Sequence, residues 1–266
     1  MIIDCHCHAG QGDGLTAPAD TDAPLGQYLQ RARAAGIDRT VIFAAFADDY
    51  RRANRIIARM VAMQPERLMG FAFVNAIADR GRVDAIVAEA VNQLGLVGIK
   101  VHAHNARITR EICESARRHK LPILYDVMDD VPVVEFLARE YPDVNFIIPH
   151  LGSFADNWRA QMALIDHLER HTNVFTDTAG VRRFDILEQA VRRAGAHKVL
   201  FGSDGPWFHP AVQLSKVGAL EITASDRALI MGGNLLRLIN VACEPVLSMR
   251  GLQQDQRALS IEFARV

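Results

Sequence analysis

Residues 1–8 read MIIDCHCH, a short apolar run that ends in two histidines. Seven further runs of similar length and β-rich composition follow it: TVIFAAF (40–46), LMGFAFV (68–74), LVGIKVH (96–102), LPILYDV (121–127), VNFIIPH (144–150), NVFTDT (173–178) and KVLFGSD (198–204). Most are nearly continuous in apolar residues rather than alternating, which indicates strands that are buried on both faces. We therefore predict eight strands of a parallel sheet.

Longer segments with helical spacing of apolar residues separate these runs, at 24–35, 48–63, 82–94, 109–119, 131–141, 158–170 and 184–194. Strands that alternate with helices form βαβ units, and eight of them favour a (β/α)₈ TIM barrel over an open doubly wound sheet. Neither a G-x-G-x-x-G nor a phosphate-binding P-loop motif follows the first strand. We expect one barrel domain over residues 1–240, followed by a C-terminal extension over 241–266 for which we have no functional interpretation.

Composition narrows the class of protein. The 266 residues include 30 basic and 31 acidic side chains, and no long run of like charge, so we expect neither a nucleic-acid nor a membrane partner. Four cysteines are too few for a disulfide scaffold in a chain of this length. The first residues contain no basic start followed by an apolar run, so we predict a cytoplasmic protein. The composition leaves a homo-oligomer open.

Ionisable side chains stand at the carboxyl ends of the predicted strands, where active sites of parallel barrels form. Burying such groups without partners is costly, and a shared cation is one partner that would serve several of them. The candidates are His6, His8, Lys100, His102, Asp126, His150 and Asp204, whereas we expect a structural role for Asp177 at the end of the seventh strand.

The pair His6-x-His8 is the sharpest local signal. Residues two apart in a strand project to the same side, so both imidazoles can reach one metal ion. Asp4 shares their parity, and we expect its carboxylate to support them. Cys5 and Cys7 have the opposite parity, which argues against a zinc site built from all four residues. A lone His-x-His pair packs in the protein about as often as it binds a metal. The other residues at the strand ends therefore decide between the two roles.

Five motifs occur in register: DCHCH (4–8), GIKVH (98–102), PHLG (149–152), LFGSDGP (200–206) and MGGN (231–234). Together they resemble the amidohydrolase superfamily over about residues 1–240, and in particular the amidohydrolase-related branch (amidohydrolase 2). That branch includes aminocarboxymuconate semialdehyde decarboxylase and small metal-dependent hydrolases. The resemblance implies a (β/α)₈ barrel with His6 and His8 as metal ligands. It implies Asp204 as a ligand and proton-handling carboxylate, and His150 as a ligand or a catalytic group beside the metal.

One position departs from the family pattern. The fifth strand of the family usually ends in a histidine ligand, whereas Asp126 stands there in this chain. A carboxylate oxygen also binds zinc or manganese, so we predict that Asp126 is a ligand; binding of substrate is the alternative. We expect a divalent metal cofactor, with zinc as the first choice and manganese as the second.

Four further residues are candidates for binding a small-molecule substrate. Lys100 can hold a carboxylate, with a solvated lysine or a carbamylated metal bridge as alternatives, and His102 shares its parity. Arg182 can clamp a substrate carboxylate, although surface arginines are common. Trp207 can wall the pocket or simply pack. The loop over 10–23, rich in glycine, aspartate and threonine, can contribute specificity.

These residues suggest three functions. The main expectation is hydrolysis of a cyclic amide, lactone or ester by metal-activated water, with Asp204 as the proton carrier and His150 or Lys100 at the developing oxyanion. Non-oxidative decarboxylation of an aromatic or unsaturated carboxylic acid is the alternative that the resembled branch implies. The third is a barrel that no longer catalyses a reaction or no longer uses a metal, here called a decayed barrel. The observation that supports it is the aspartate at position 126, where the family usually has a histidine ligand.

Overall fold

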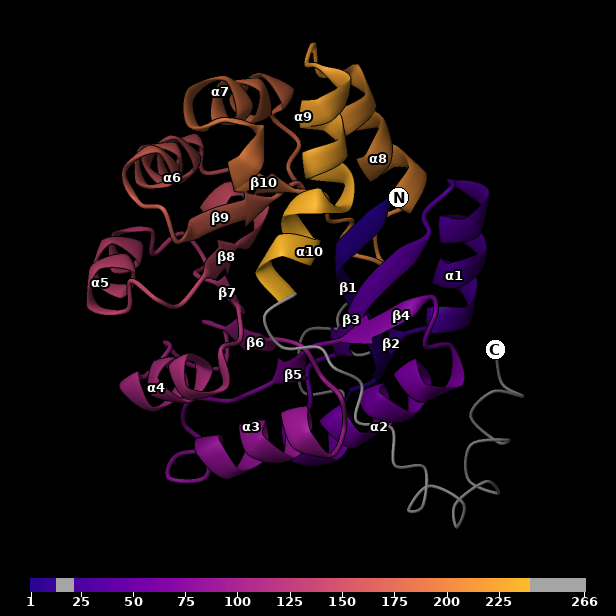
Figure 1. Cartoon of the computed structure of the whole chain (residues 1–266), viewed down its shortest axis with the longest axis vertical. Helices are drawn as coiled ribbons and strands as arrows, with labels where there is room; N and C mark the ends of the chain where they lie inside the picture. Colours follow the sequence, from indigo (N-terminus) through magenta and orange to yellow (C-terminus); the bar gives the residue numbers. More distant parts are fainter. Residues whose placement is uncertain (13–21, 240–266) are drawn as a thin grey trace.

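The computed structural model describes residues 1–12 and 22–239, and in these ranges it is a (β/α)₈ barrel (Figure 1). The C-terminal extension and most of the loop over 10–23 lie outside the described residues. Nine parallel strands fill the eight barrel positions: β1 (Ile3–Gln11), β3 (Arg39–Ala44), β4 (Leu68–Gly70), β5 (Ala72–Phe73), β6 (Ile99–His102), β7 (Ile123–Asp126), β8 (Phe146–Ile148), β9 (Val174–Asp177) and β10 (Val199–Leu200). β4 and β5 share the third position, and β2 (Asp22–Ala23) pairs antiparallel with β1.

The strands pair in sequence order around the barrel. Phe71 joins β4 to β5, and its N–H donates to the Ile42 carbonyl at 3.0 Å. The barrel closes where the segment after β10 meets β1. There Cys5 N–H donates to Phe201 O at 2.9 Å, and His8 N–H donates to Gly205 O at 2.7 Å. This seam joins the first strand of the chain to the last.

In the part of the chain that the structure describes, the helices α1 to α8 lie outside the ring of strands (Figure 1). They are α1 (Leu25–Ala34), α2 (Tyr50–Met63), α3 (Val83–Asn92), α4 (Arg110–His119), α5 (Pro132–Glu140), α6 (Trp158–Arg170), α7 (Phe184–Ala194) and α8 (Pro210–Ala219). Seven of them fall within the predicted helical segments, and their buried side chains join those of the strands in one continuous apolar core.

The last described elements cover the seam. α9 (Ala224–Ala228), η3 (Leu229–Gly233) and α10 (Asn234–Ile239) follow α8, and η3 packs against β1 and β10. A side chain at Gly232 would stand 2.9 Å from Ile3, so the close approach requires glycine. The Asn234 amide donates to Ala196 O at 2.8 Å and to Val199 O at 2.7 Å. The MGGN motif therefore secures the barrel closure.

The register of β1 shifts between Asp4 and Cys7, where one extra residue enters the strand relative to β3. This irregularity overturns the predicted parity of Asp4. Its carboxylate turns to α1, where Tyr28 Oη donates to Oδ2 at 2.5 Å. Oδ1 accepts the N–H of His6 at 3.0 Å and that of Ser203 at 2.9 Å. Asp4 thus holds the backbone next to the metal-ligand candidates, and its side chain does not lie on the same side of β1 as the imidazoles.

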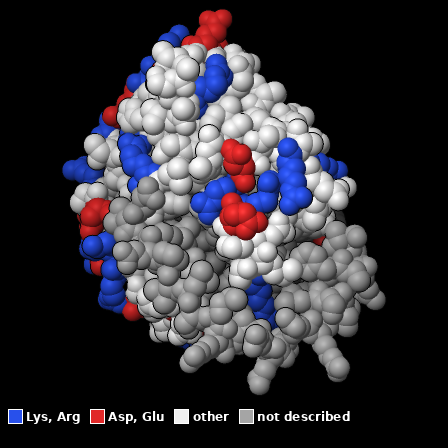
Figure 2. Space-filling model, turned by 45° about the vertical axis from the view of Figure 1, so that its right-hand side comes forward, with Lys and Arg blue, Asp and Glu red and all other residues white. Residues whose placement is uncertain are grey.

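The exterior matches the balanced composition. On the face shown in Figure 2, basic and acidic side chains are interspersed rather than gathered by sign. Within the described ranges, no helix has both the length and the apolar character that a bilayer span requires.

Candidate metal centre

The structure brings His6, His8 and Asp204 together at the barrel seam. One ligand atom from each lies within 4.8 Å of the other two, and all three side chains are buried. Asp204 Oδ1 is 3.4 Å from His6 Nε2 and 3.8 Å from His8 Nε2. Two imidazoles and a carboxylate are three of the ligands that catalytic zinc sites use, with room for a fourth position.

Both histidines are oriented for binding through Nε2. His6 Nδ1 lies 2.7 Å from Asp177 Oδ2, and His8 Nδ1 lies 3.2 Å from Ala44 O. These acceptors place the ring proton on Nδ1 and leave the Nε2 lone pair for a metal. His6 Nε2 is buried and has no hydrogen-bond partner among the described residues. Such an orphaned nitrogen fits a metal ligand, because a buried polar atom is costly without a partner.

The protonation states agree with this arrangement. Burial, reinforced by the positive charge of Lys100, lowers the pKa of His6 and lowers that of His8 well below its usual range. Neutral imidazole is the form that binds a metal. Neither of the two metal-capable clusters among the described residues contains a cysteine, as the predicted parity of Cys7 required.

The backbone at Asp204 is specialised. Asp204 lies in the left-handed region, with φ of 58°, and its N–H donates to His6 O at 2.8 Å. Aspartate tolerates this conformation better than most residues. His150 is also left-handed, with φ of 59°, and its N–H donates to Asp177 Oδ1 at 3.1 Å. Two predicted site residues are therefore held in sparsely populated conformations by hydrogen bonds to the site itself.

Asp126 lies outside the three-residue cluster and has partners of its own. Its Oδ2 is 3.1 Å from His102 Nε2 and 3.4 Å from His150 Nε2, and its Oδ1 accepts the Met128 N–H at 2.9 Å. Burial alone would raise the pKa of Asp126, but His102 and His150 hold it well below its usual range. The carboxylate is thus already paired, which removes the physical reason for expecting it on the metal.

His102 and His150 face Asp126 in different states. The Nδ1 of His102 accepts the His104 N–H at 3.0 Å, so its proton sits on Nε2 and points to Asp126. His150 Nδ1 donates to Ala179 O at 2.7 Å, so its Nε2 also needs a proton to face a carboxylate. Burial opposes this charge, yet Asp126 raises the pKa of His150 to about 9. Both ring nitrogens of His150 thus face acceptors, which favours the protonated ring.

Lys100 is buried in the same region. Its Nζ has no hydrogen-bond partner among the described residues and lies 4.9 Å from the centroid of the Phe43 ring. The Phe43 ring is in turn 5.2 Å from His6 and 4.6 Å from His8. Burial lowers the pKa of Lys100, and the carboxylates of Asp126, Asp204 and Asp177 oppose the shift. Lys100 is therefore a buried amine without a hydrogen-bond acceptor among the described residues, which is a favourable position for binding an anionic group.

Aromatic rings surround the histidines. Trp207 lies 4.6 Å from His8 between ring centroids, and Phe154 lies 5.2 Å from His150. Phe46 lies 4.9 Å from His102. The sequence suggested Trp207 as a pocket wall but missed the three phenylalanines Phe43, Phe46 and Phe154. Each follows or lies within an apolar run that reads as core, so spacing alone carried no signal.

Arg182 lies at the edge of this region. Its guanidinium pairs with Asp156, donates to Phe154 O at 2.9 Å and stacks on the Phe154 ring at 5.7 Å. The side chain is 53% exposed. Its charge is therefore already matched, and it stands behind Phe154 rather than beside the metal-ligand candidates.

A family model described as amidohydrolase matches residues 3–241. No curated protein sequence matches the chain.

Solved structures of similar fold include three enzymes. The 5-carboxyvanillate decarboxylase of Sphingomonas paucimobilis has a TM-score of 0.70 at 15% identity, covering 90% of this chain and 98% of that one. A dihydroxybenzoic acid decarboxylase of Polaromonas, with bound manganese and the inhibitor 2-nitroresorcinol, has a TM-score of 0.68 at 18% identity, covering 91% and 98%. The 4-oxalomesaconate hydratase of Rhodopseudomonas palustris has a TM-score of 0.66 at 17% identity, covering 90% and 96%.

Proposed function

This chain belongs to the amidohydrolase family, and we propose that it is a metal-dependent decarboxylase of a small aromatic or unsaturated carboxylic acid. The observation that carries the proposal is the buried Lys100 ammonium without a hydrogen-bond acceptor among the described residues, close to the His6–His8–Asp204 cluster. Two of the similar structures are decarboxylases of aromatic acids, which supports this alternative over the hydrolysis that the sequence first favoured.

His6, His8 and Asp204 are the residues that would hold a divalent ion, with zinc or manganese as candidates. When bound, the ion would supply positive charge that stabilises the anion formed as the carbon–carbon bond breaks. We assign Asp126 the role of positioning His102 and His150 rather than that of a metal ligand, because its oxygens already have partners.

The remaining steps follow from the side chains. Lys100 binds an anionic group of the substrate, and Trp207 and Phe46 pack against its unsaturated carbon skeleton. The substrate carboxylate leaves as carbon dioxide, and its bonding electron pair remains on the carbon that carried it. Asp204 first takes a proton from solvent on its Oδ2 side and then gives it to that carbon, which returns Asp204 to the carboxylate.

Decarboxylation has a direct test. The purified chain, loaded with manganese or zinc, is incubated with a panel of hydroxybenzoates carrying ¹³C in the carboxyl group. We expect ¹³C-labelled carbon dioxide and bicarbonate to appear in the NMR spectrum, at a rate that chelation of the metal reduces. A product that gains water without loss of the labelled carbon would instead place the chain among hydrolases or hydratases.

Hydrolysis of a cyclic amide, lactone or ester is the second candidate. The position of Asp204 beside both imidazoles favours it, since a carboxylate there can accept a proton from a water molecule that attacks a carbonyl. The decayed barrel has less support, because both histidines are held in the metal-binding tautomer. A cytoplasmic location stays a prediction.

A further inference from the structure

A second cluster of metal-ligating side chains lies on the outside of the barrel, between α5 and the end of α6. It consists of Glu135, His167 and His171, whose ligand atoms lie within 4.8 Å of one another. His167 and His171 are four residues apart, so they share one side of α6 and its C-cap. Their rings stack with a centroid distance of 5.8 Å.

The three ligand atoms converge on one point. Glu135 Oε2 is 2.9 Å from His171 Nε2 and 3.3 Å from His167 Nδ1. His167 Nδ1 also accepts a hydrogen bond from Arg170 Nη2 at 3.1 Å, since arginine can only donate. The same Nη2 lies 3.5 Å from Glu135 Oε2. One guanidinium nitrogen thus occupies the position of a cation shared by a carboxylate and an imidazole.

The exposed fractions of these side chains indicate which of them can move. The histidines are nearly covered, at 9% for His167 and 14% for His171, whereas Arg170 is 56% exposed. Arg170 can swing into solvent at little cost, because exposed ion pairs contribute only about 0.2–1 kcal/mol. The histidines would remain in place.

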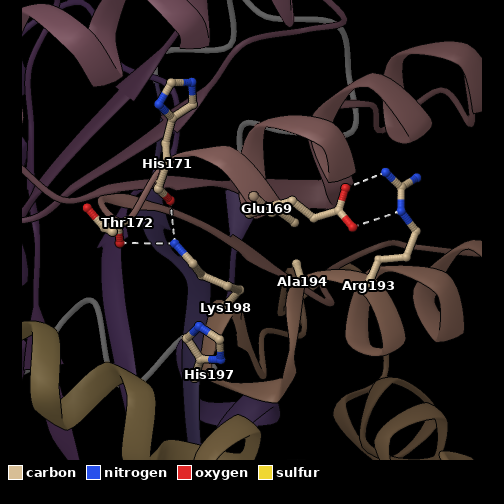
Figure 3. A pocket seen from close by; sticks show the side chains of 8 residues that line it. Glu169, His171, Thr172, Arg193, Ala194, His197 and Lys198 are labelled. Atoms are coloured by element: carbon tan, nitrogen blue, oxygen red, sulfur yellow. Dashed lines mark hydrogen bonds and ion pairs between the residues drawn. The ribbon is translucent and has the colours of Figure 1, made fainter.

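The main chain of His171 is anchored on its other side. Lys198 Nζ donates to His171 O at 2.5 Å and to Thr172 O at 3.0 Å, at the wall of a cavity of about 360 Å³. Figure 3 shows the imidazole of His171 pointing away from Lys198, so the ring takes no part in those hydrogen bonds. A fixed backbone lowers the entropy that a ligand must overcome to order the ring.

We propose that Glu135, His167 and His171 form a second, peripheral site for a transition-metal ion such as Zn²⁺, which displaces the guanidinium of Arg170. Two imidazoles and a carboxylate suit zinc, copper or nickel and leave a fourth position open to water. The ion takes the place of the hydrogen between His171 Nε2 and Glu135, and the neutral ring then carries its single proton on Nδ1. The site would fasten α5 to α6. The site is independent of the proposed function, because the two sites lie at opposite ends of β9. His171 precedes that strand, whereas Asp177, which contacts His6, ends it.

The test counts zinc on the full-length protein by elemental analysis after equilibrium dialysis. We expect His171→Ala to bind one zinc ion fewer than the wild type. Adding His171→Ala to the His6→Ala/His8→Ala variant should likewise lower its zinc count by one. Glu135→Gln should weaken the affinity of that site by more than about tenfold, since even loss of an outer partner has such an effect. An unchanged zinc count in His171→Ala, with native circular dichroism, would overturn the proposal. If only the proposed metal centre at His6, His8 and Asp204 is wrong, His171→Ala should still lower the zinc count by one.

Arg170→Gln and Arg139→Gln form the matched pair. Arg139 also pairs with Glu135, at 3.6 Å, but it makes no contact with either histidine in the described ion pairs. We expect Arg170→Gln to tighten zinc binding by about two- to fivefold, and Arg139→Gln to change it by less. Equal or weaker binding by Arg170→Gln would contradict displacement of the guanidinium.

Discussion

His6 Nδ1 and Asp177 Oδ2 lie 2.7 Å apart, although 171 residues separate them in the chain. The carboxylate fixes the ring so that Nε2 faces Asp204, and its other oxygen accepts the N–H groups of His150 and Ala179. One buried aspartate therefore holds both the ring of His6 and the backbone of the neighbouring His150.

Asp177→Asn is the first test of this relationship. The amide keeps the size of the side chain but removes its charge, so we expect the affinity for zinc to fall by about ten- to a hundredfold. Competition with a coloured chelator measures the dissociation constant, in the His171→Ala background so that only the metal centre is counted. Asp185→Asn, at an exposed acid, is the control. Equal affinity in both variants would mean that Asp177 does not tune His6.

Asp126→Asn separates the two roles considered for that residue. If Asp126 positions His102 and His150, the metal content should stay the same while kcat falls by roughly 10²-fold, a typical loss for impaired proton handling. Elemental analysis and steady-state kinetics measure the two quantities. Asp130→Asn, whose carboxylate pairs with Arg107, serves as the nearby control. Loss of the metal together with activity would restore Asp126 to the ligand set.

Lys100→Met should affect binding and stability in opposite directions. Removing a charge–charge contact with the substrate weakens binding by about 1.5–3 kcal/mol, so KM should rise tenfold or more. Because burial lowers the pKa of Lys100, charging it costs stability at neutral pH, and the free energy of unfolding should rise. Urea denaturation in the presence of chelator tests this.

Lys216→Met is the matched control for Lys100→Met. Lys216 Nζ donates to Thr178 O at 2.8 Å, to Val181 O and to Gln213 Oε1, both at 2.6 Å. Its loss removes the donor to Val181 O and one of the two donors to each of Thr178 O and Gln213 Oε1. We expect this variant to lose stability. If both lysine variants lose stability alike, Lys100 has acceptors in solution that the described structure does not contain.

Metal removal should destabilise the barrel. A ligand present at a hundred times its dissociation constant stabilises the folded state by about 2.7 kcal/mol. We therefore expect that much difference in the free energy of unfolding of His171→Ala between saturating zinc and chelator. His6→Ala/His8→Ala in the same background should show almost none of it. A persistent difference in that variant would locate the stabilising ion elsewhere.

The described cysteines should resist alkylation. Cys5, Cys7 and Cys113 are buried, and burial raises the pKa of all three thiols, that of Cys113 to about 12. At pH 8 only about one Cys113 in 10⁴ is then a thiolate, the reactive form. Mass spectrometry after iodoacetamide treatment should find these three unmodified in native protein and modified in urea. Rapid native labelling of Cys113 would indicate local opening of α4.

The repeating pattern of apolar runs was enough to predict the barrel, because βαβ units have a strong periodic signal. The helix over 158–170 agrees with α6 at both ends. The parity of Asp4 failed for a reason that spacing does not encode: the extra residue in β1 is set by pairing with β3. One irregularity in a strand moves every later side chain to the other face.

The candidate site was only partly predictable. Strand ends of a barrel meet, which indicated the region, and the resemblance to the amidohydrolases singled out His6, His8 and Asp204 within it. The partners of Asp126 could not be predicted. Its contacts with the Met128 N–H and with His102 depend on how the loops fold, which the spacing of residues does not show. Arg182 was proposed from its charge, yet in the structure that charge pairs with Asp156, a partner that spacing in the sequence does not indicate.

The seam between β1 and the segment after β10 has a consequence for synthesis. During translation, the two histidines leave the ribosome almost 200 residues ahead of Asp204. A nascent chain therefore holds an incomplete coordination set until the final strand emerges and docks. Selective uptake of the proposed cofactor must then await completion of the whole barrel.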